Sequence, residues 1–209
     1  RINMVDSDAP IMTHKDGQKI PSYSHQSGRD SKYGVATAAQ TTQNNDLPED
    51  LLPIVDQSIE NTGEKHNKIT GDCGFCDYDI LQKVEDEREE EFYIPDRRFS
   101  ASQKEGKGKF SIEKFEKGAD GVYTCPAGNP MEYQRTLTFE DGHTVDVYQG
   151  TACTGCSLKK RCTNGKKRNI TLDSRIPYRD IMRAKLKSEE GREIYMKRQG
   201  LIEPVHGDD

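Results

Sequence analysis

The sequence has 209 residues, of which 32% are hydrophobic, 32% are charged and none is Trp, so we expect one thin core with at most one inserted domain and long surface segments. The net charge of −5 argues against a protein that coats nucleic acid through overall positive charge. An apolar run of roughly 18 residues and a secretion signal are both missing, so we expect a cytoplasmic protein with no membrane partner.

The first part of the chain predicts a loop, a hairpin and a surface helix. Residues 1–20 are polar and rich in turn signals, and we interpret them as a loop that enters a strand. Residues 23–40 have an extended pattern with a turn near residues 30–34, which indicates a hairpin. Asp46 can cap a helix that Gly63 ends. The expected buried face of this helix consists of Leu51, Leu52, Val55 and Ile59.

A strand, a helix and a second strand follow, which is the order of an α/β unit with parallel strands. The strands are predicted at residues 68–70 and 92–94, and the helix at about residues 77–88. The helix positions predicted to be buried are Ile80, Leu81 and Val84. Ligands gather at the carboxyl ends of such strands, and Asp72 follows the first of them.

The composition changes after residue 96, and residues 97–173 are rich in Lys, Gly and Thr. β-like runs occur at residues 122–124, 131–139 and 144–148, the last two joined by an Asp-Gly turn signal. We therefore predict a core part at residues 1–96 and a small β-rich insertion at residues 97–173. Residues 174–209 are predicted to form a helical segment that belongs to the core. In this last segment Ser188 is a plausible N-cap, and Pro204 should end or kink the helix.

Four cysteines of the insertion give the sharpest metal signal. Cys153 and Cys156 have the spacing of a C-x2-C knuckle, and Cys125 and Cys162 can complete a tetrahedral thiolate site for zinc. A zinc ion would supply much of the folding energy of so polar a segment. The alternative is a set of ordinary reduced thiols, and His143 is a further candidate ligand.

Other polar residues allow two interpretations each. Cys73 and Cys76 flank Asp72, where half-buried thiols are favoured over a redox pair. Asp72 and Glu203 can share a divalent metal, although acids far apart in sequence are more often structural or solvent-facing. Basic residues cluster in the insertion, either as solvated surface or as a DNA-binding patch. These residues are Lys159, Lys160, Arg161, Lys166, Lys167 and Arg168.

Three sequence segments, residues 69–75, 92–99 and 195–205, together resemble motifs of prokaryotic insertion-sequence transposases of the Asp-Asp-Glu (DDE) type. The resemblance implies an RNase-H-like catalytic fold in which Asp72 is the second catalytic acid and Glu203 the third. It also implies that Tyr195 and Arg198 contact DNA near the cleaved end. The four cysteines of the insertion match a cysteine-bearing insertion in one branch of the family.

The resemblance implies metal-dependent cleavage of transposon ends and strand transfer into target DNA, with Mg²⁺ or Mn²⁺ held by three carboxylates, in an enzyme that acts as a homodimer. The first acid lies on an earlier strand that this sequence does not contain. We therefore interpret the chain as a C-terminal fragment with a partial RNase-H-like α/β fold, inactive alone. The alternatives are a non-enzymatic, zinc-ribbon-like module that binds DNA or a protein, and a decayed remnant.

Overall fold

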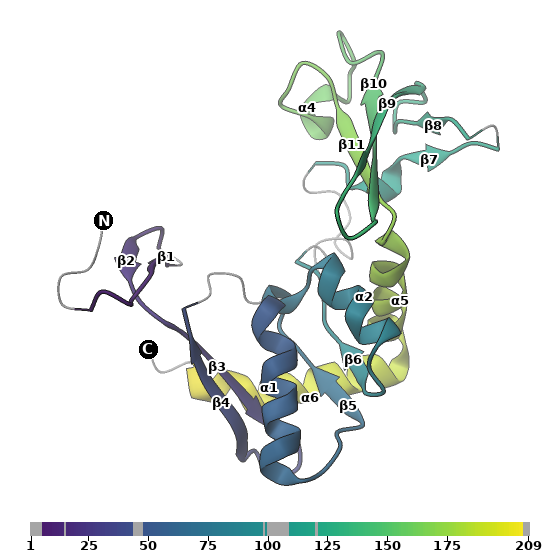
Figure 1. Ribbon diagram of the computed structural model, residues 1–209. Helices are drawn as coiled ribbons and strands as arrows, with labels where there is room; N and C mark the ends of the chain where they lie inside the picture. The colour runs from purple at the N-terminus through teal and green to yellow at the C-terminus, as the bar shows by residue number, and fades with distance from the viewer. Residues whose placement is uncertain are drawn as a thin grey trace. The chain divides into compact units, whose positions relative to one another are not determined.

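The computed structural model describes residues 6–14, 16–43, 48–97, 99, 109–119 and 121–206, the side chains of 199 and 202–206 excepted. The chain divides into two compact units (Figure 1). Unit 1 comprises residues 1–97 and 178–209, and unit 2 comprises residues 98–177. Helices and small sheets together confirm the predicted α/β class. None of the described helices is long and apolar enough to cross a membrane.

Unit 1 begins with two antiparallel hairpins. The first joins β1 (Ile11–Thr13) to β2 (Lys19–Pro21), where the sequence predicted a loop. The second joins β3 (Ser24–Arg29) to β4 (Ala36–Thr42), which confirms the predicted hairpin. Its turn contains Gly34, whose φ of 68° favours glycine.

Helix α1 (Pro48–Thr62) packs against the β3–β4 hairpin and ends before Gly63, as predicted. The predicted cap Asp46 lies outside the described residues. The buried face is rotated from the predicted one, because Ile54 and the polar Ser58 are buried where Leu52 and Ile59 were expected. The buried side chains of the helix are Asp50, Leu51, Ile54, Val55 and Ser58.

A parallel β-α-β unit follows. Strand β5 (Lys68–Thr70) pairs in parallel with β6 (Glu91–Tyr93), and helix α2 (Tyr78–Asp86) connects them after the short 3-10 turn η1 (Cys73–Phe75). This confirms the predicted unit. The side chain of Asp77 caps α2 by accepting a hydrogen bond from the backbone N–H of Ile80 at 2.8 Å. The buried α2 positions are the predicted Ile80, Leu81 and Val84.

Two helices complete unit 1. Helix α5 (Ile176–Lys187) buries Met182 and Leu186, and the Arg183 guanidinium donates to both carboxylate oxygens of Asp96 at 2.6 and 3.1 Å. The Ser188 hydroxyl accepts from the N–H of Gly191, which confirms the predicted cap of α6 (Glu189–His206). Of the two predicted effects of Pro204, an end of the helix is wrong, because α6 continues to His206, and a kink stays a prediction. A proline removes only one backbone donor, and few helical hydrogen bonds depend on it so close to a helix end.

Unit 2 contains a three-stranded antiparallel sheet in the order β11-β10-β9 and a two-stranded pair, β7–β8. The predicted hairpin of the insertion is confirmed by β9 and β10, which meet at Gly142 with φ 86°. Among the described residues, its buried hydrophobic core consists of Phe115, Met131 and Ile170. The elements are η2 (Ile112–Lys114), β7 (Glu116–Lys117), β8 (Tyr123–Thr124), β9 (Met131–Thr138), β10 (Thr144–Gly150), α4 (Lys159–Cys162) and β11 (Asn169–Asp173).

Candidate functional site

Asp72 lies at the carboxyl end of β5, where a parallel pair presents its ligand-binding edge. The preceding Gly71 donates its N–H to the carbonyl of Tyr93 at 3.1 Å. A Cβ at Gly71 would lie 3.3 Å from the Ile94 side chain, so glycine lets β5 end close against that buried residue. Asp72 then caps η1, because its Oδ1 accepts from the N–H of Gly74 at 3.1 Å.

The Asp72 carboxylate is paired with an arginine from the last helix. The Arg198 Nη2 donates to Asp72 Oδ2 at 3.1 Å, and the Asp72 side chain remains 51% exposed. Partial burial raises the pKa of Asp72, but hydrogen bonds from the Cys73 thiol, the Gly74 N–H and Arg198 outweigh it, so the net pKa lies below the usual value. Asp72 is therefore an ionised oxygen donor with solvent access, and Arg198 is its counter-ion.

The other residues assigned by resemblance lie on α6. The Cζ of Arg198 is 5.8 Å from the centre of the Tyr195 ring, so this pair lies beside Asp72. Glu203 also belongs to α6, but its side chain is outside the described set. Among the described side chains, no three His, Cys, Asp or Glu residues are grouped closely enough to hold a metal ion.

The two cysteines next to Asp72 are poorly suited to redox chemistry, which needs a thiolate. Burial raises the pKa of Cys76 to about 12, and the Asp96 carboxylate adds to that effect. Burial and the Asp72 carboxylate raise the pKa of Cys73 as well. Both side chains are free, half-buried thiols, in agreement with the favoured interpretation from the sequence.

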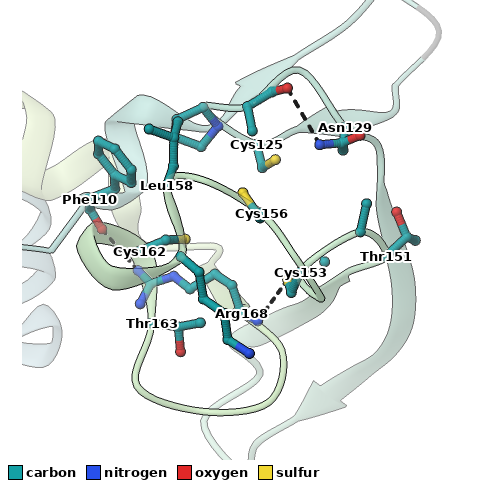
Figure 2. Close-up of a pocket in the computed structure, with 15 residues that line it drawn as sticks. Phe110, Cys125, Asn129, Thr151, Cys153, Cys156, Leu158, Cys162, Thr163 and Arg168 are labelled. Carbon is teal, nitrogen blue, oxygen red and sulfur yellow. Dashed lines mark hydrogen bonds between the residues drawn. The ribbon is translucent and has the colours of Figure 1, made fainter.

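The four cysteines of unit 2 converge on one small cavity of about 20 Å³, although they are spread widely along the chain (Figure 2). One follows β8, two lie in the loop after β10 and one ends α4. These residues are Cys125, Cys153, Cys156 and Cys162. All four are half-buried free thiols.

Two close contacts position the sulfur of Cys153. A Cβ at Gly150 would lie 2.8 Å from the Sγ of Cys153, so only glycine lets the end of β10 approach that sulfur. The backbone N–H of Arg168 donates to the same sulfur at 3.4 Å. Burial raises the pKa of Cys162, the Arg168 charge opposes this rise, and the other three cysteines add to it. The other three cysteines therefore lie near enough to influence the pKa of Cys162.

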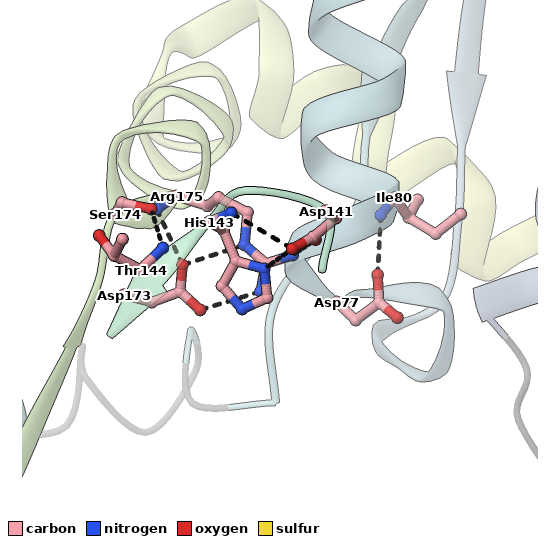
Figure 3. A network of polar contacts seen from close by, with 8 residues as sticks. All are labelled: Asp77, Ile80, Asp141, His143, Thr144, Asp173, Ser174 and Arg175. Atoms are coloured by element: carbon pink, nitrogen blue, oxygen red, sulfur yellow. Dashed lines mark hydrogen bonds and ion pairs between the residues drawn. The ribbon is translucent and has the colours of Figure 1, made fainter. Parts of the chain in front are cut away.

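His143, the further candidate ligand, lies in the β9–β10 turn and is not among the residues that line the cavity. Its ring stacks on Phe139 with centroids 4.2 Å apart, and its Nδ1 contacts the carboxylate of Asp141 (Figure 3). Arg175 bonds the carboxylate of Asp173 through Nε and Nη2 at 3.0 and 2.9 Å. This polar network lies at the β9–β10 turn and at the end of β11.

The six basic residues of the insertion do not form a uniform surface. Arg161 lies over the ring of Phe110 at 5.1 Å, and Arg168 donates to the Phe110 carbonyl at 3.0 Å. Lys167 donates to the side chain of Gln149 at 3.0 Å. Half of the predicted patch is therefore engaged in contacts within unit 2.

A family model described as the transposase DDE domain matches residues 124–208. This part of the chain is similar to DDE transposases. The matched segment includes the four cysteines, α5 and α6 with Glu203, and it lies wholly after Asp72. The match supports the resemblance to DDE transposases inferred from the sequence. The search of curated proteins and the search of solved structures found no match for the chain.

Proposed function

We propose that this chain is part of a prokaryotic insertion-sequence DDE transposase with an RNase-H-like catalytic core. The observation that carries the proposal is the match of residues 124–208 to the DDE domain. The parallel β5–β6 pair supports it, because it puts an ionised carboxylate at the edge where such folds bind ligands.

In this proposal Asp72 is the second catalytic acid and Glu203 the third. Asp72 fits a divalent cation, since it offers ionised, half-exposed carboxylate oxygens. Mg²⁺ or Mn²⁺ held by Asp72 and Glu203 would activate water or a DNA 3′-hydroxyl and stabilise the leaving oxygen. Arg198 balances the Asp72 charge when no cation is present, and with Tyr195 it is available to contact the DNA end.

The DNA backbone is proposed to contact unit 2 near α4. Lys159 and Lys160 line an open hollow together with Thr163 and Asn164. Such side chains bind phosphate without reading sequence, so binding should weaken as salt rises. Transposon ends and target DNA are the proposed partners, and a homodimer would hold two ends.

The test uses the 209-residue chain with Mn²⁺ as the probe. We expect Mn²⁺ to broaden the NMR signals around Asp72, and Asp72→Asn to abolish the effect while Cys73→Ser keeps it. We also expect no metal-dependent nicking of a DNA duplex, because the two carboxylates proposed here hold metal less firmly than three would. Broadening that ignores Asp72→Asn would refute the metal site. Nicking that Asp72→Ala removes would refute only the inactivity.

A second candidate function rests on the cavity of unit 2, which four cysteines line. Thiolates are preferred zinc ligands, and four of them suit a tetrahedral ion. The four described side chains do not yet form a metal-holding group, so they would turn toward one another to bind the ion. We propose that Cys125, Cys153, Cys156 and Cys162 hold a structural zinc. Unit 2 would then be a zinc-ribbon-like module that binds DNA or a protein without catalysis. One equivalent of zinc, with salt-sensitive DNA binding that Glu203→Ala leaves unchanged, favours this function over the catalytic one.

A further inference from the structure

The hollow beside α4 has no carboxylate among the described residues that line it. Two of its side chains, Lys159 and Lys160, end in ammonium groups, which can only donate hydrogen bonds. Thr163 and Asn164 also line it, and their side chains can each donate and accept. The kind of ligand that fits the hollow therefore depends on which of their atoms are already engaged.

The oxygen atoms of Thr163 and Asn164 are engaged within unit 2. The Thr163 Oγ1 accepts from the backbone N–H of Gly165 at 3.1 Å. The Asn164 Oδ1 accepts from the Nζ of Lys109 at 2.7 Å. In the described part of the chain, neither the Thr163 O–H nor the Asn164 NH2 group donates to another residue. Both side chains therefore keep donors for a ligand.

Lys109 determines which way the Asn164 amide faces. An ammonium group has no acceptor, so the Asn164 oxygen must point toward Lys109 and the NH2 group away from it. The same ammonium donates to the Lys160 carbonyl at 2.6 Å, and the backbone N–H of Phe110 donates to the Arg161 carbonyl at 3.0 Å. Two successive carbonyls of α4 therefore hold Lys109 in place.

A ligand that suits this lining carries negative charge and acceptor oxygens in several directions. A phosphate group has both, and hydrogen bonds to a charged acceptor are stronger than those between neutral groups. A carboxylate offers two oxygens in one plane, whereas the donors of the hollow come from four side chains. The hollow therefore fits a phosphate group best.

We propose, building on the DNA contact proposed for α4, that this hollow is a phosphate site in which Thr163 and Asn164 donate to the phosphate oxygens. Lys109 is a positioning residue of the site, because it orients the Asn164 amide. The phosphate is one of a DNA backbone, and inorganic phosphate offers the same oxygens. The basic cluster in the sequence does not include Lys109, which lies 51 positions before Lys160.

The first test uses duplex DNA and the 209-residue chain. Asn164→Asp keeps an oxygen for Lys109, but it removes the NH2 donor and adds a negative charge. Asn169→Asp is the matched control, because Asn169 is exposed on β11 and its Oδ1 likewise accepts, from Gln149 at 3.1 Å. We expect Asn164→Asp to weaken DNA binding about 10–100-fold, the effect of losing a hydrogen bond to a charged group. Asn169→Asp should have a much smaller effect, and equal losses in both variants would overturn the site.

The second test separates the two sources of phosphate. In NMR spectra of the wild-type chain, inorganic phosphate should shift the side-chain amide signals of Asn164 and leave those of Asn169 in place. Unshifted Asn164 signals would overturn the phosphate site. Shifted signals in a chain that binds no DNA would support the phosphate site and refute the DNA contact proposed for α4.

The third test concerns Lys109. Lys109→Met releases the Asn164 amide and should weaken DNA binding about 10-fold, whereas Lys109→Arg still donates to that amide and should bind nearly as well as the wild type. In an Asn164→Ala background, Lys109→Met should cost less than it does alone, because its effect passes through the amide. Equal losses in both backgrounds would overturn the positioning role, as would a loss in Lys109→Arg as large as in Lys109→Met.

Discussion

Units 1 and 2 bury very different interiors. Unit 1 packs apolar side chains from both helices and strands, and Leu81, Phe92 and Ile94 are at most 1% exposed. In the described part of unit 2, only Phe115, Met131 and Ile170 are buried hydrophobics. Each buried side chain of this kind contributes about 1.5–3 kcal/mol, whereas ordering each residue costs about 1–2 kcal/mol. The described part of unit 2 therefore has less apolar burial to offset this cost, and the zinc proposed at its four cysteines would be a further source of stability.

The largest expected effect comes from removing one thiol of unit 2. Cys153→Ser should abolish zinc binding and unfold unit 2 while unit 1 stays folded, because a tetrahedral site with three thiolates loses most of its affinity. Site-resolved hydrogen exchange, with zinc counted by atomic spectroscopy, measures both results. Cys73→Ser in unit 1 is the matched control and should leave zinc unchanged. Normal protection of β9–β11 in Cys153→Ser would contradict the comparison.

The next largest effect concerns the apolar core of unit 1. Leu81→Ala should lower the free energy of unfolding of unit 1 by about 2–5 kcal/mol, because it leaves a cavity beside well-packed neighbours. Hydrogen exchange of α2 and β6 reports the loss. Leu137→Ala, at a residue 39% exposed on β9, serves as the control and should have a much smaller effect. Equal losses in both variants would show that Leu81 is not packed in an apolar core as described.

A smaller effect is expected from a substitution at Gly150, whose backbone lies close to the Cys153 sulfur. Gly150→Ala places a methyl group 2.8 Å from the Cys153 sulfur, so that sulfur must move. We expect a loss of about 1–3 kcal/mol in the stability of unit 2, typical of overpacking, with weaker zinc binding. Gly165→Ala is the control, since its nearest neighbour would lie at an ordinary 3.4 Å. Zinc titration measures the affinity of both variants. An unchanged zinc affinity in Gly150→Ala would show that the added methyl group does not displace the Cys153 sulfur.

The smallest effect concerns a cap in unit 1, visible beside Ile80 in Figure 3. Asp77→Ala removes the acceptor for the first turn of α2 and should cost about 1 kcal/mol. Asp77→Asn keeps an acceptor oxygen and should lose much less. Thermal unfolding of the two variants separates them, and a loss that is the same in both would mean that charge rather than capping matters at Asp77.

The sequence predicted those parts of unit 1 in which hydrophobic residues recur with a helical period. Ile80, Leu81 and Val84 recur at helical spacing and are buried as predicted. The buried face of α1 was partly wrong, because Ser58 is buried through hydrogen bonds with Thr37 and His66, which no hydrophobic pattern contains. Strands β7 and β11 and helix α4 were missed, since elements of two to five residues show no period.

For the candidate site, too, the sequence predicted local features but not contacts between residues far apart in the chain. The position of Asp72 followed from the end of a strand, a local signal. Its pairing with Arg198 joins residues 126 positions apart, and the gathering of four cysteines depends on the tertiary path of unit 2. The spacing in the sequence predicted the four cysteines as a set. Only the three-dimensional structure distinguishes Arg168, which is half-buried and has a buried Nε, from the exposed Lys166 and Lys167.

The ion pair between Asp72 and Arg198 has a consequence for how DNA and metal act on each other. A divalent cation and the guanidinium compete for the same carboxylate, so a DNA phosphate that draws Arg198 away makes Asp72 a stronger ligand. Thermodynamic reciprocity then requires the cation to strengthen DNA binding by the same factor. In the proposed transposase, the metal would be held most tightly when DNA occupies the site, which limits stray hydrolysis when it does not.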